Sequence, residues 1–208
     1  MPKLGEIESI AGFSLHRAML PVPAQHAMLG DLRRVIAAAP LMRFTTAWGK
    51  PMSVRMTSAG RLGWMIDRGR YRYASRHPET GAPWPPIPDS VLKIWRAVSG
   101  WPDDPDCCLI NWYGEGTRMG LHQDKDEGDF AAPVVSISLG DPARFRMGGT
   151  DRKGPTESTM LHSGDVVVMG GEARLAYHGI DRVMFGEGTL LPEGGRINLT
   201  LRVVSDAL

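Results

Sequence analysis

The sequence predicts a mainly β protein with flanking α-helices, built as a jelly roll or a related double sheet. The chain holds 25 Gly and 16 Pro among 208 residues, which is typical of many turns and short strands. After Gly100, short β-rich runs follow one another and are separated by Gly, Pro and Asp. No internal repeat, low-complexity tract or linker divides the chain, so residues 1–208 are predicted to form a single domain.

Two helices are expected ahead of the β-rich region. The first covers residues 23–38, because a proline opens it, apolar residues recur on one side and Pro40 ends it. The second covers about residues 90–99, where Asp89 or the serine after it can cap the first turn and Gly100 stops the helix. These two helices are expected to flank the β core.

The β core is predicted within residues 105–204. Its eight expected strands cover residues 107–113, 121–124, 134–139, 144–147, 158–161, 165–169, 175–178 and 196–204. Eight short strands at this spacing are typical of a jelly roll.

Residues 41–78 carry a local excess of positive charge, although the net charge of the chain is only +1. Asp67 is the one acidic residue of this stretch, whose basic residues are Arg43, Lys50, Arg55, Arg61, Arg68, Arg70, Arg72 and Arg76. Aromatic residues are interleaved with them: Trp48, Trp64, Tyr71 and Tyr73. A surface that holds a polyanion with stacking bases needs this combination. The alternative is a solvated arginine-rich loop, and we expect strands and a flexible lid here.

The composition also indicates the cellular compartment. No stretch of about 18 consecutive apolar residues is present, and no secretory leader is recognisable at the N-terminus. The only cysteines, Cys107 and Cys108, are adjacent and lie in an apolar run, which favours plain packing in a reducing environment. We therefore expect a soluble, non-secreted, cytoplasmic protein.

Three residues are candidates for a metal site. In the segment LHQDKD, His122 and Asp124 share a face if the strand stays extended through residue 126. His178 follows at the end of a predicted strand, whereas the other four histidines lie outside the β region or head a turn. Two imidazoles and one carboxylate leave one side of Fe(II) open, as in non-haem oxygenases. An HxD triplet also occurs by chance, and zinc is the alternative metal.

The last predicted strand, RINLTLR, separates polar from apolar residues. Arg196, Asn198, Thr200 and Arg202 alternate with apolar positions, so they share one face. Guanidinium forks bind carboxylates through paired charge-assisted hydrogen bonds, which makes this face suited to a dianion. The alternative is an exposed strand whose arginines lie in water.

Three ordered segments resemble the AlkB-type Fe(II)- and 2-oxoglutarate-dependent nucleic-acid dealkylases. They are NWYGEGTRMGLHQDKDE, HSGDVVVMGGEARLAYHGI and RINLTLR. The similarity extends from about residue 43 to residue 204. It implies a double-stranded β-helix at residues 105–204, preceded by a nucleotide-recognition lid at residues 41–78.

The resemblance also implies roles for individual residues. It assigns the iron to His122, Asp124 and His178. It assigns 2-oxoglutarate to Asn111, Tyr113, Arg196, Asn198 and Arg202. Arg196 and Tyr113 are expected at the distal carboxylate of 2-oxoglutarate, and Arg202 nearer the end that binds the metal.

By the same resemblance, five residues face the nucleic acid. Met56 and Trp64 are expected against the damaged base, Asp126 in contact with it, and Tyr71 and Arg152 toward the phosphate backbone or the pocket rim. A plain core position is the alternative for Trp64.

One position departs from the bacterial pattern. Met169 stands after DVVV where an aromatic residue is expected, which affects the shape of the pocket and the substrate preference, not the iron chemistry.

The implied reaction is oxidative demethylation of N-alkylated bases, such as 1-methyladenine and 3-methylcytosine, in direct-reversal repair. The reaction uses Fe(II) as its metal, consumes 2-oxoglutarate and O2, and releases formaldehyde, succinate and CO2. The expected partner is alkylated DNA, preferably single-stranded, with RNA as a second substrate. We expect a monomer with no membrane contact and no obligate protein partner. The alternatives are a 2-oxoglutarate oxygenase acting on tRNA, protein or a small molecule, and a non-catalytic metal- or nucleic-acid-binding module.

Overall fold

The computed structural model describes residues 6–204, apart from residues 47, 48 and 68. Trp48 and Arg68, two members of the basic and aromatic stretch, therefore lie outside the described residues. Across the described part of the chain, no helix is both long and apolar enough to span a membrane.

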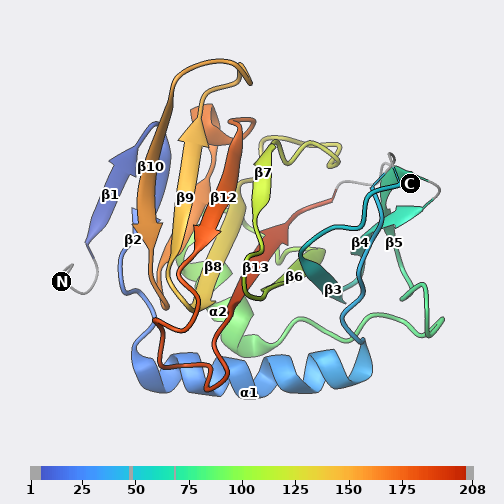
Figure 1. The fold of residues 1–208 in the computed structure, drawn as a ribbon. Coiled ribbons are helices and arrows are strands. Elements are labelled where there is room, and N and C mark those ends of the chain that lie inside the picture. Colours follow the sequence, from blue (N-terminus) through green and yellow to red (C-terminus); the bar gives the residue numbers. More distant parts are fainter. Residues whose placement is uncertain (1–5, 47–48, 68, 205–208) are drawn as a thin grey trace.

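The described chain forms a large sheet, a smaller sheet and a hairpin (Figure 1). The large sheet has the order β1-β2-β11-β8-β13-β6-β3. Its strands are β1 (Ile7–Ile10), β2 (Phe13–His16), β3 (Arg55–Gly60), β6 (Cys107–Tyr113), β8 (Val134–Gly140), β11 (Val166–Met169) and β13 (Arg196–Arg202). The smaller sheet has the order β10-β9-β12-β7. Its strands are β7 (Met119–His122), β9 (Ala143–Gly148), β10 (Thr156–Leu161) and β12 (His178–Val183).

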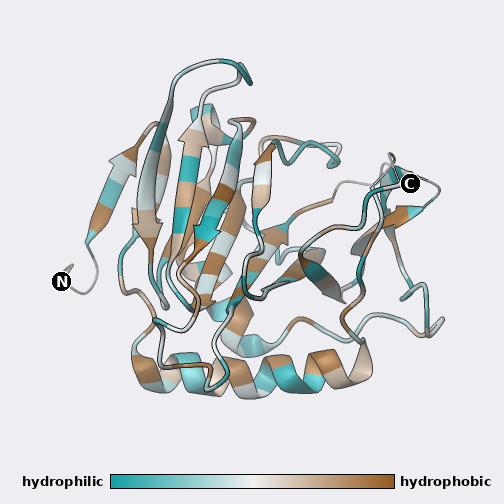
Figure 2. Ribbon diagram, viewed as in Figure 1, coloured by the Kyte–Doolittle hydropathy of each residue, from teal (hydrophilic) through white to brown (hydrophobic). Residues whose placement is uncertain are grey.

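Two apolar layers pack against the large sheet, one on each of its faces. One layer lies between the sheets, where Phe13 and Val167 of the large sheet join Phe145 and Ile180 of the smaller one. Figure 2 shows the alternation of hydrophilic and hydrophobic residues along β9 that such a half-buried strand requires. The predicted jelly-roll architecture, mainly β with flanking helices, is confirmed.

The second layer joins the outer face of the large sheet to the two helices, α1 (Val22–Ala38) and α2 (Asp89–Val98). In β13, Leu199 and Leu201 pack in this layer with Leu32 of α1 and Trp95 of α2. Both helices were predicted to within about a residue. Because the apolar face of β13 is covered in this way, its polar face points toward the other sheet.

The N-terminal hairpin β1–β2 was not predicted. Its strands have four residues each and too few apolar positions for a recognisable pattern. Long-range contacts hold it instead: β2 pairs with β11, and the buried Arg17 guanidinium bonds to Asp165 at 3.1 Å. The same guanidinium bonds locally to Glu8 of β1 at 2.8 Å.

Residues 41–78 divide between two sheets. β3 pairs with β6 and so belongs to the large sheet. β4 (Gly63–Asp67) and β5 (Arg70–Ala74) form a separate two-stranded hairpin. This hairpin lies next to β3, at the end of the large sheet opposite β1 (Figure 1).

Candidate metal centre and its cavity

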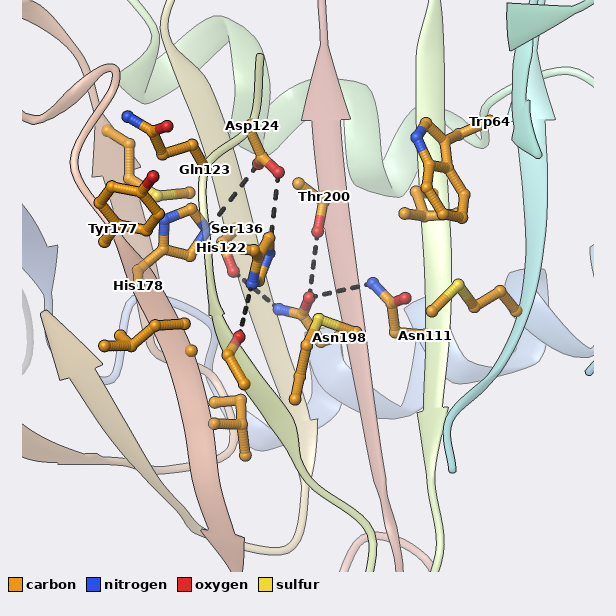
Figure 3. A pocket seen from close by; sticks show the side chains of 18 of the residues that line it. Trp64, Asn111, His122, Gln123, Asp124, Ser136, Tyr177, His178, Asn198 and Thr200 are labelled. Atoms are coloured by element: carbon orange, nitrogen blue, oxygen red, sulfur yellow. Dashed lines mark hydrogen bonds and ion pairs between the residues drawn. The ribbon is translucent and has the colours of Figure 1, made fainter. Parts of the chain in front are cut away.

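A cavity of about 510 Å³ opens between the two sheets, and the hairpin borders it. Figure 3 shows the His–Asp group on one side of Asn198, with Trp64 on the far side of Asn111. All thirteen residues that the sequence singled out for iron, 2-oxoglutarate or the base line this one cavity. The fold thus brings together side chains from β3 to β13.

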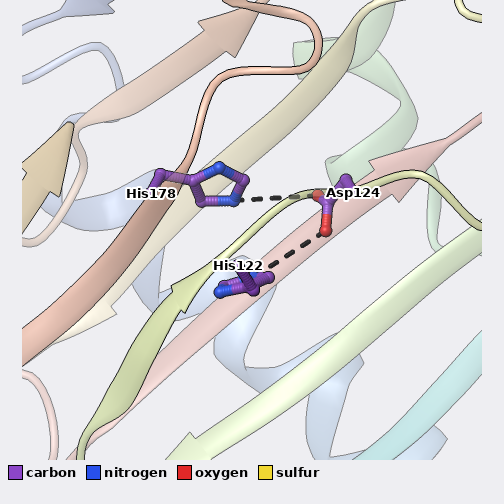
Figure 4. A group of neighbouring side chains, drawn as sticks. All are labelled: His122, Asp124 and His178. Atoms are coloured by element: carbon purple, nitrogen blue, oxygen red, sulfur yellow. Dashed lines mark ion pairs between the residues drawn. The ribbon is translucent and has the colours of Figure 1, made fainter. Parts of the chain in front are cut away.

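Three of these side chains form a compact metal-binding group (Figure 4). The potential ligand atoms of His122, Asp124 and His178 all lie within 4.8 Å of one another. The Nε2 atom of His122 lies 3.8 Å from Asp124 Oδ1, and that of His178 lies 3.9 Å from Asp124 Oδ2. His122 ends β7 and His178 begins β12, where the two residues are paired across the strands.

Two predictions about this segment were wrong. The expected strands at 121–124 and 175–178 are displaced: β7 ends at His122, and β12 begins at His178 rather than ending there. Asp124 therefore approaches the histidines from a loop, not from an extended strand that presents residues 122, 124 and 126 on one face. The bond from Gln123 Nε2 to the Leu175 carbonyl, at 2.6 Å, turns the chain out of the strand.

Backbone contacts fix the tautomer of both imidazoles. His122 Nδ1 lies 2.9 Å from the Gly120 carbonyl, and His178 Nδ1 lies 3.0 Å from the Ala176 carbonyl. Because a carbonyl only accepts, each Nδ1 carries the hydrogen and donates it, which leaves the Nε2 lone pairs to face Asp124.

The donor set fits a divalent iron. Asp124 Oδ2 is buried and finds no hydrogen-bond partner among the residues that the structure describes. An orphaned carboxylate oxygen beside two imidazole lone pairs is completed by a metal ion, and two histidines with one carboxylate are the ligands of non-haem Fe(II) oxygenases.

Electrostatics hold these ligands in their metal-binding forms. Burial alone would raise the pKa of Asp124, but Arg202, His178 and His122 outweigh it and keep that pKa well below its usual range. Burial, reinforced by His122, lowers the pKa of His178 to about 4. At neutral pH the carboxyl is ionised and the imidazole of His178 is neutral, as metal binding requires.

Deeper in the cavity, β13 presents a buried cation with only neutral hydrogen-bond partners. Arg196 has no exposed surface, and its guanidinium donates to Ser138 Oγ at 2.7 Å and to the Asp141 carbonyl at 3.4 Å. Its Nε finds no hydrogen-bond partner in the part of the chain that the structure describes. Burial lowers the pKa of Arg196 to about 10. A carboxylate ligand in the cavity would offset this desolvation cost.

The remaining polar residues form a connected row. Asn198 donates to Ser136 Oγ at 2.7 Å and accepts from Thr200 at 3.1 Å and from Asn111 at 3.4 Å (Figure 3). Among the described residues, Asn111 Oδ1 has no hydrogen-bond partner. The hydroxyl of buried Tyr113 donates to the sulfur of Met119, 3.6 Å away. These spare polar atoms are available to a polar ligand.

Arg202 differs from Arg196 because its guanidinium is already engaged. Its Nη2 donates to Asp124 Oδ1 at 2.8 Å, and its Nε forms an ion pair with Glu127 at 3.4 Å. Arg202 thus lies beside the metal ligands, and its charge orients Asp124.

The outer part of the cavity is aromatic and open. Trp64 and Tyr71 stack with ring centroids 5.3 Å apart, and Trp64 Nε1 donates to Asp126 at 2.9 Å. Tyr71 is 52% exposed, and Arg152 lies over the ring of Tyr177 at 6.0 Å. Trp64 is only half-buried, so the core position considered from the sequence does not describe it.

Met56 and Met169 border the same cavity, and both are buried. Met56 comes from β3 and Met169 ends β11. Their flexible thioethers supply apolar lining at two separate places, because β8, β13 and β6 lie between β11 and β3 in the large sheet.

Sequence reasoning missed several residues that hold the ligands in place. Hydrogen bonds that span about 50 positions of the chain join the loop of Asp124 to the segment before His178. They are made by Gln123 and Glu127 of the loop and by Arg174 of that segment. No periodic pattern marks them, because each contact depends on where two loops meet.

Comparisons with known proteins agree with this geometry. The family model of the 2OG-Fe(II) oxygenase superfamily matches residues 12–202. An alpha-ketoglutarate-dependent dioxygenase AlkB homolog of Caulobacter vibrioides is 51% identical over 193 residues, which cover 93% of this chain and 88% of that protein. The alpha-ketoglutarate-dependent dioxygenase AlkB of Escherichia coli is 44% identical over 183 residues, covering 86% and 84%.

A solved structure, described as the structure of OsALKBH1, superposes with a TM-score of 0.76 at 28% identity. The superposition covers 95% of this chain and 100% of the chain in the solved structure. The likeness therefore extends over both sheets and the hairpin. This chain belongs to the 2OG-Fe(II) oxygenase superfamily and, within it, to the AlkB family of alpha-ketoglutarate-dependent dioxygenases.

Proposed function

We propose that this enzyme oxidatively demethylates N-alkylated bases in nucleic acid. Its preferred substrates are 1-methyladenine and 3-methylcytosine in single-stranded DNA, with RNA as a second substrate. The enzyme acts as a monomer in the cytoplasm without an obligate protein partner. One observation carries the proposal: a stacked aromatic pair and a His–Asp–His group line the same cavity.

The inner residues hold the metal and the co-substrate. His122, Asp124 and His178 would hold Fe(II), and Arg196 with Tyr113 would bind the distal carboxylate of 2-oxoglutarate. When bound with 2-oxoglutarate and O2, the iron supplies the oxidising power that converts the N-methyl group into a hydroxymethyl group, which then leaves as formaldehyde. Asn111 and Asn198 offer amide groups that orient the co-substrate, and Arg202 lies at its metal-binding end.

The outer residues receive the base. Extrusion of a base costs least where pairing is already broken, as it is in 1-methyladenine and 3-methylcytosine. Trp64 offers a face on which the base stacks, with a cation–π contribution because both methylated rings carry positive charge. Asp126 is exposed and places a carboxylate beside that stack, so it balances the charge of the ring.

Exposed arginines around the hairpin favour a nucleic-acid substrate. Arg55 and Arg70 are exposed on β3 and β5, and Arg152 lies exposed at the cavity rim. Guanidinium groups at the rim bind phosphate oxygens, and this contact weakens as salt is added. A small-molecule oxygenase needs no such rim.

The test is a panel of substrates. The enzyme with Fe(II) and 2-oxoglutarate is given oligonucleotides that carry 1-methyladenine or 3-methylcytosine, as single-stranded DNA, duplex DNA and RNA. Formaldehyde and succinate are measured together, with unmethylated strands and omission of 2-oxoglutarate as controls. We expect equal amounts of both products, highest with single-stranded DNA. Succinate that forms only with a protein or a small molecule refutes the nucleic-acid assignment.

A second measurement addresses a non-catalytic binding module. Fe(II) and 2-oxoglutarate are added without oxygen, and a weak visible charge-transfer band is expected when 2-oxoglutarate chelates the metal. Absence of the band, together with absence of turnover, favours the inert module.

A further inference from the structure

The β4–β5 hairpin contacts two consecutive residues of the loop that carries the metal ligand Asp124. Trp64 of β4 and Tyr73 of β5 are directly opposite in the register, so their side chains share one face of the hairpin. Trp64 Nε1 donates to Asp126 Oδ2 at 2.9 Å, and the Tyr73 hydroxyl donates to Glu127 Oε1. One cross-strand pair therefore holds the chain two and three residues beyond Asp124.

Glu127 connects this contact to the metal ligand. Its side chain is buried and forms ion pairs with Arg174 at 3.1 Å and with Arg202 at 3.4 Å. The same two arginines hold Asp124: Arg202 donates to its carboxylate at 2.8 Å, and Arg174 donates to its main-chain carbonyl at 2.6 Å. Both cations that fix Asp124 are thus fixed in turn by Glu127.

The charges of this group balance. Two buried carboxylates, Asp124 and Glu127, face two buried guanidiniums, Arg174 and Arg202. Removing the charge of Glu127 would leave one cation without compensation, which is costly in a buried site. Removing the Tyr73 hydroxyl changes no charge and leaves Glu127 with both arginines.

Two tyrosines of β5, two positions apart, therefore make different contacts. Tyr71 is 52% exposed and stacks on Trp64 at the open side of the cavity, whereas Tyr73 is 5% exposed and reaches the buried charges. A displacement of the hairpin moves the stacking surface and the Glu127 contact together.

We propose that Tyr73 and Glu127 are positioning residues that couple the β4–β5 hairpin to the metal ligand Asp124. An occupied metal centre fixes Asp124 and its arginines, which favours the hairpin position that contacts Asp126 and Glu127, and that position in turn favours the ligand geometry of Asp124. The coupling is reciprocal, as thermodynamic linkage requires. This inference rests on the proposed function only in that the same hairpin carries the base-stacking residue Trp64.

The test measures hydrogen–deuterium exchange of the amides of β4 and β5 in the full chain, with and without saturating Mn(II). In the wild type we expect Mn(II) to slow this exchange by about fivefold or more, the lower end of typical coupling. In Tyr73→Phe the slowing should fall below about twofold, while the Kd for Mn(II) changes by less than about threefold.

Glu127→Gln provides a second variant with a different expected result. It should lose the slowing and also weaken Mn(II) binding by about tenfold or more, as loss of a residue that supports a metal ligand commonly does. Glu157→Gln, at an exposed position of β10, is the matched control and should keep the wild-type Kd and the wild-type slowing.

Two results overturn the proposal. If Mn(II) does not slow exchange in the wild-type hairpin, there is no coupling to explain. If Tyr73→Phe raises exchange equally with and without Mn(II), the ratio is unchanged and the hydroxyl only stabilises the hairpin. Neither measurement uses nucleic acid, so a failure of the substrate assignment appears in the formaldehyde assay alone.

Discussion

The two ends of the cavity are built in opposite ways. At the inner end, His178, Asp124 and Arg196 are 8%, 6% and 0% exposed, and buried charges and main-chain carbonyls fix their positions. At the outer end, Tyr71 is 52% exposed and the contacts are ring stacking and a single hydrogen bond to an exposed carboxylate. The comparison indicates that buried contacts fix the candidate metal and co-substrate residues, whereas the proposed base-stacking residues lie on a more open surface that touches the metal-ligand loop through few contacts.

The largest effect is expected from loss of a metal ligand at the inner end. His178→Ala removes one of the two imidazoles, so formaldehyde release should fall below detection while binding of a methylated oligonucleotide stays within about threefold of the wild type. His162→Ala is the matched control, because His162 is exposed in a turn away from the cavity. Measurable turnover by His178→Ala would contradict the metal assignment.

A smaller effect is expected from the buried cation of β13. Arg196→Gln removes a desolvated charge that would bind 2-oxoglutarate, and such losses cost about 2–5 kcal/mol. The KM for 2-oxoglutarate should therefore rise about 10²-fold, with oligonucleotide binding unchanged. Arg144→Gln, at an exposed position of β9, should leave this KM unaltered. An unchanged KM in Arg196→Gln would remove Arg196 from the co-substrate site.

Loss of a residue at the outer end should affect the KM for the oligonucleotide and not the KM for 2-oxoglutarate. Trp64→Ala removes a stacking face worth about 1–3 kcal/mol per base, so the KM for a methylated oligonucleotide should rise about 5–150-fold. The KM for 2-oxoglutarate should stay within about twofold, because the hydrogen bond and the ring contacts of Trp64 within the described residues involve Asp126, Phe44 and Tyr71 and not Arg196 or Asn198. Trp64→Phe should recover most of the loss, since a smaller ring still stacks. Equal effects on both KM values would break the comparison between the two ends.

The smallest effect concerns the thiols behind the inner end. Burial raises the pKa of Cys107 to about 11 and that of Cys108 further, so the thiolate fraction of Cys107 at pH 8 is only about one in 10³. A thiol reagent at pH 8 should leave the native enzyme unlabelled, and labelling should increase as the pH rises toward the raised pKa. Both cysteines should react after unfolding. Rapid labelling of the folded protein would show that the inner end is open to solvent.

The sequence alone predicted much of the inner end, because its signals are local. The alternation in RINLTLR placed Arg196, Asn198 and Arg202 on one face, and the structure points that face into the cavity. The apolar face of β13 packs outside, against the two helices. The buried positions of Cys107 and Cys108 are confirmed as well. The particular roles of the residues toward 2-oxoglutarate and the base stay predictions.

Tertiary structure decided the approach of Asp124. The sequence placed Asp124 on a strand, and it lies in a loop that Gln123 and Arg174 hold to the segment before His178. The orientation of its carboxylate toward the histidines is therefore set by hydrogen bonds between distant loops, not by the twofold periodicity of a strand.

By itself, the sequence determined which side chains are available and which of them share a strand face, because a strand repeats every two residues regardless of its neighbours. Only the tertiary structure decided that the β4–β5 hairpin, the loop after Asp124 and β13 meet at Glu127. The physical reason is that a buried carboxylate is stable only where hydrogen-bond donors or cations from other segments reach it, and packing of the whole chain brings Arg174, Arg202 and Tyr73 to that point.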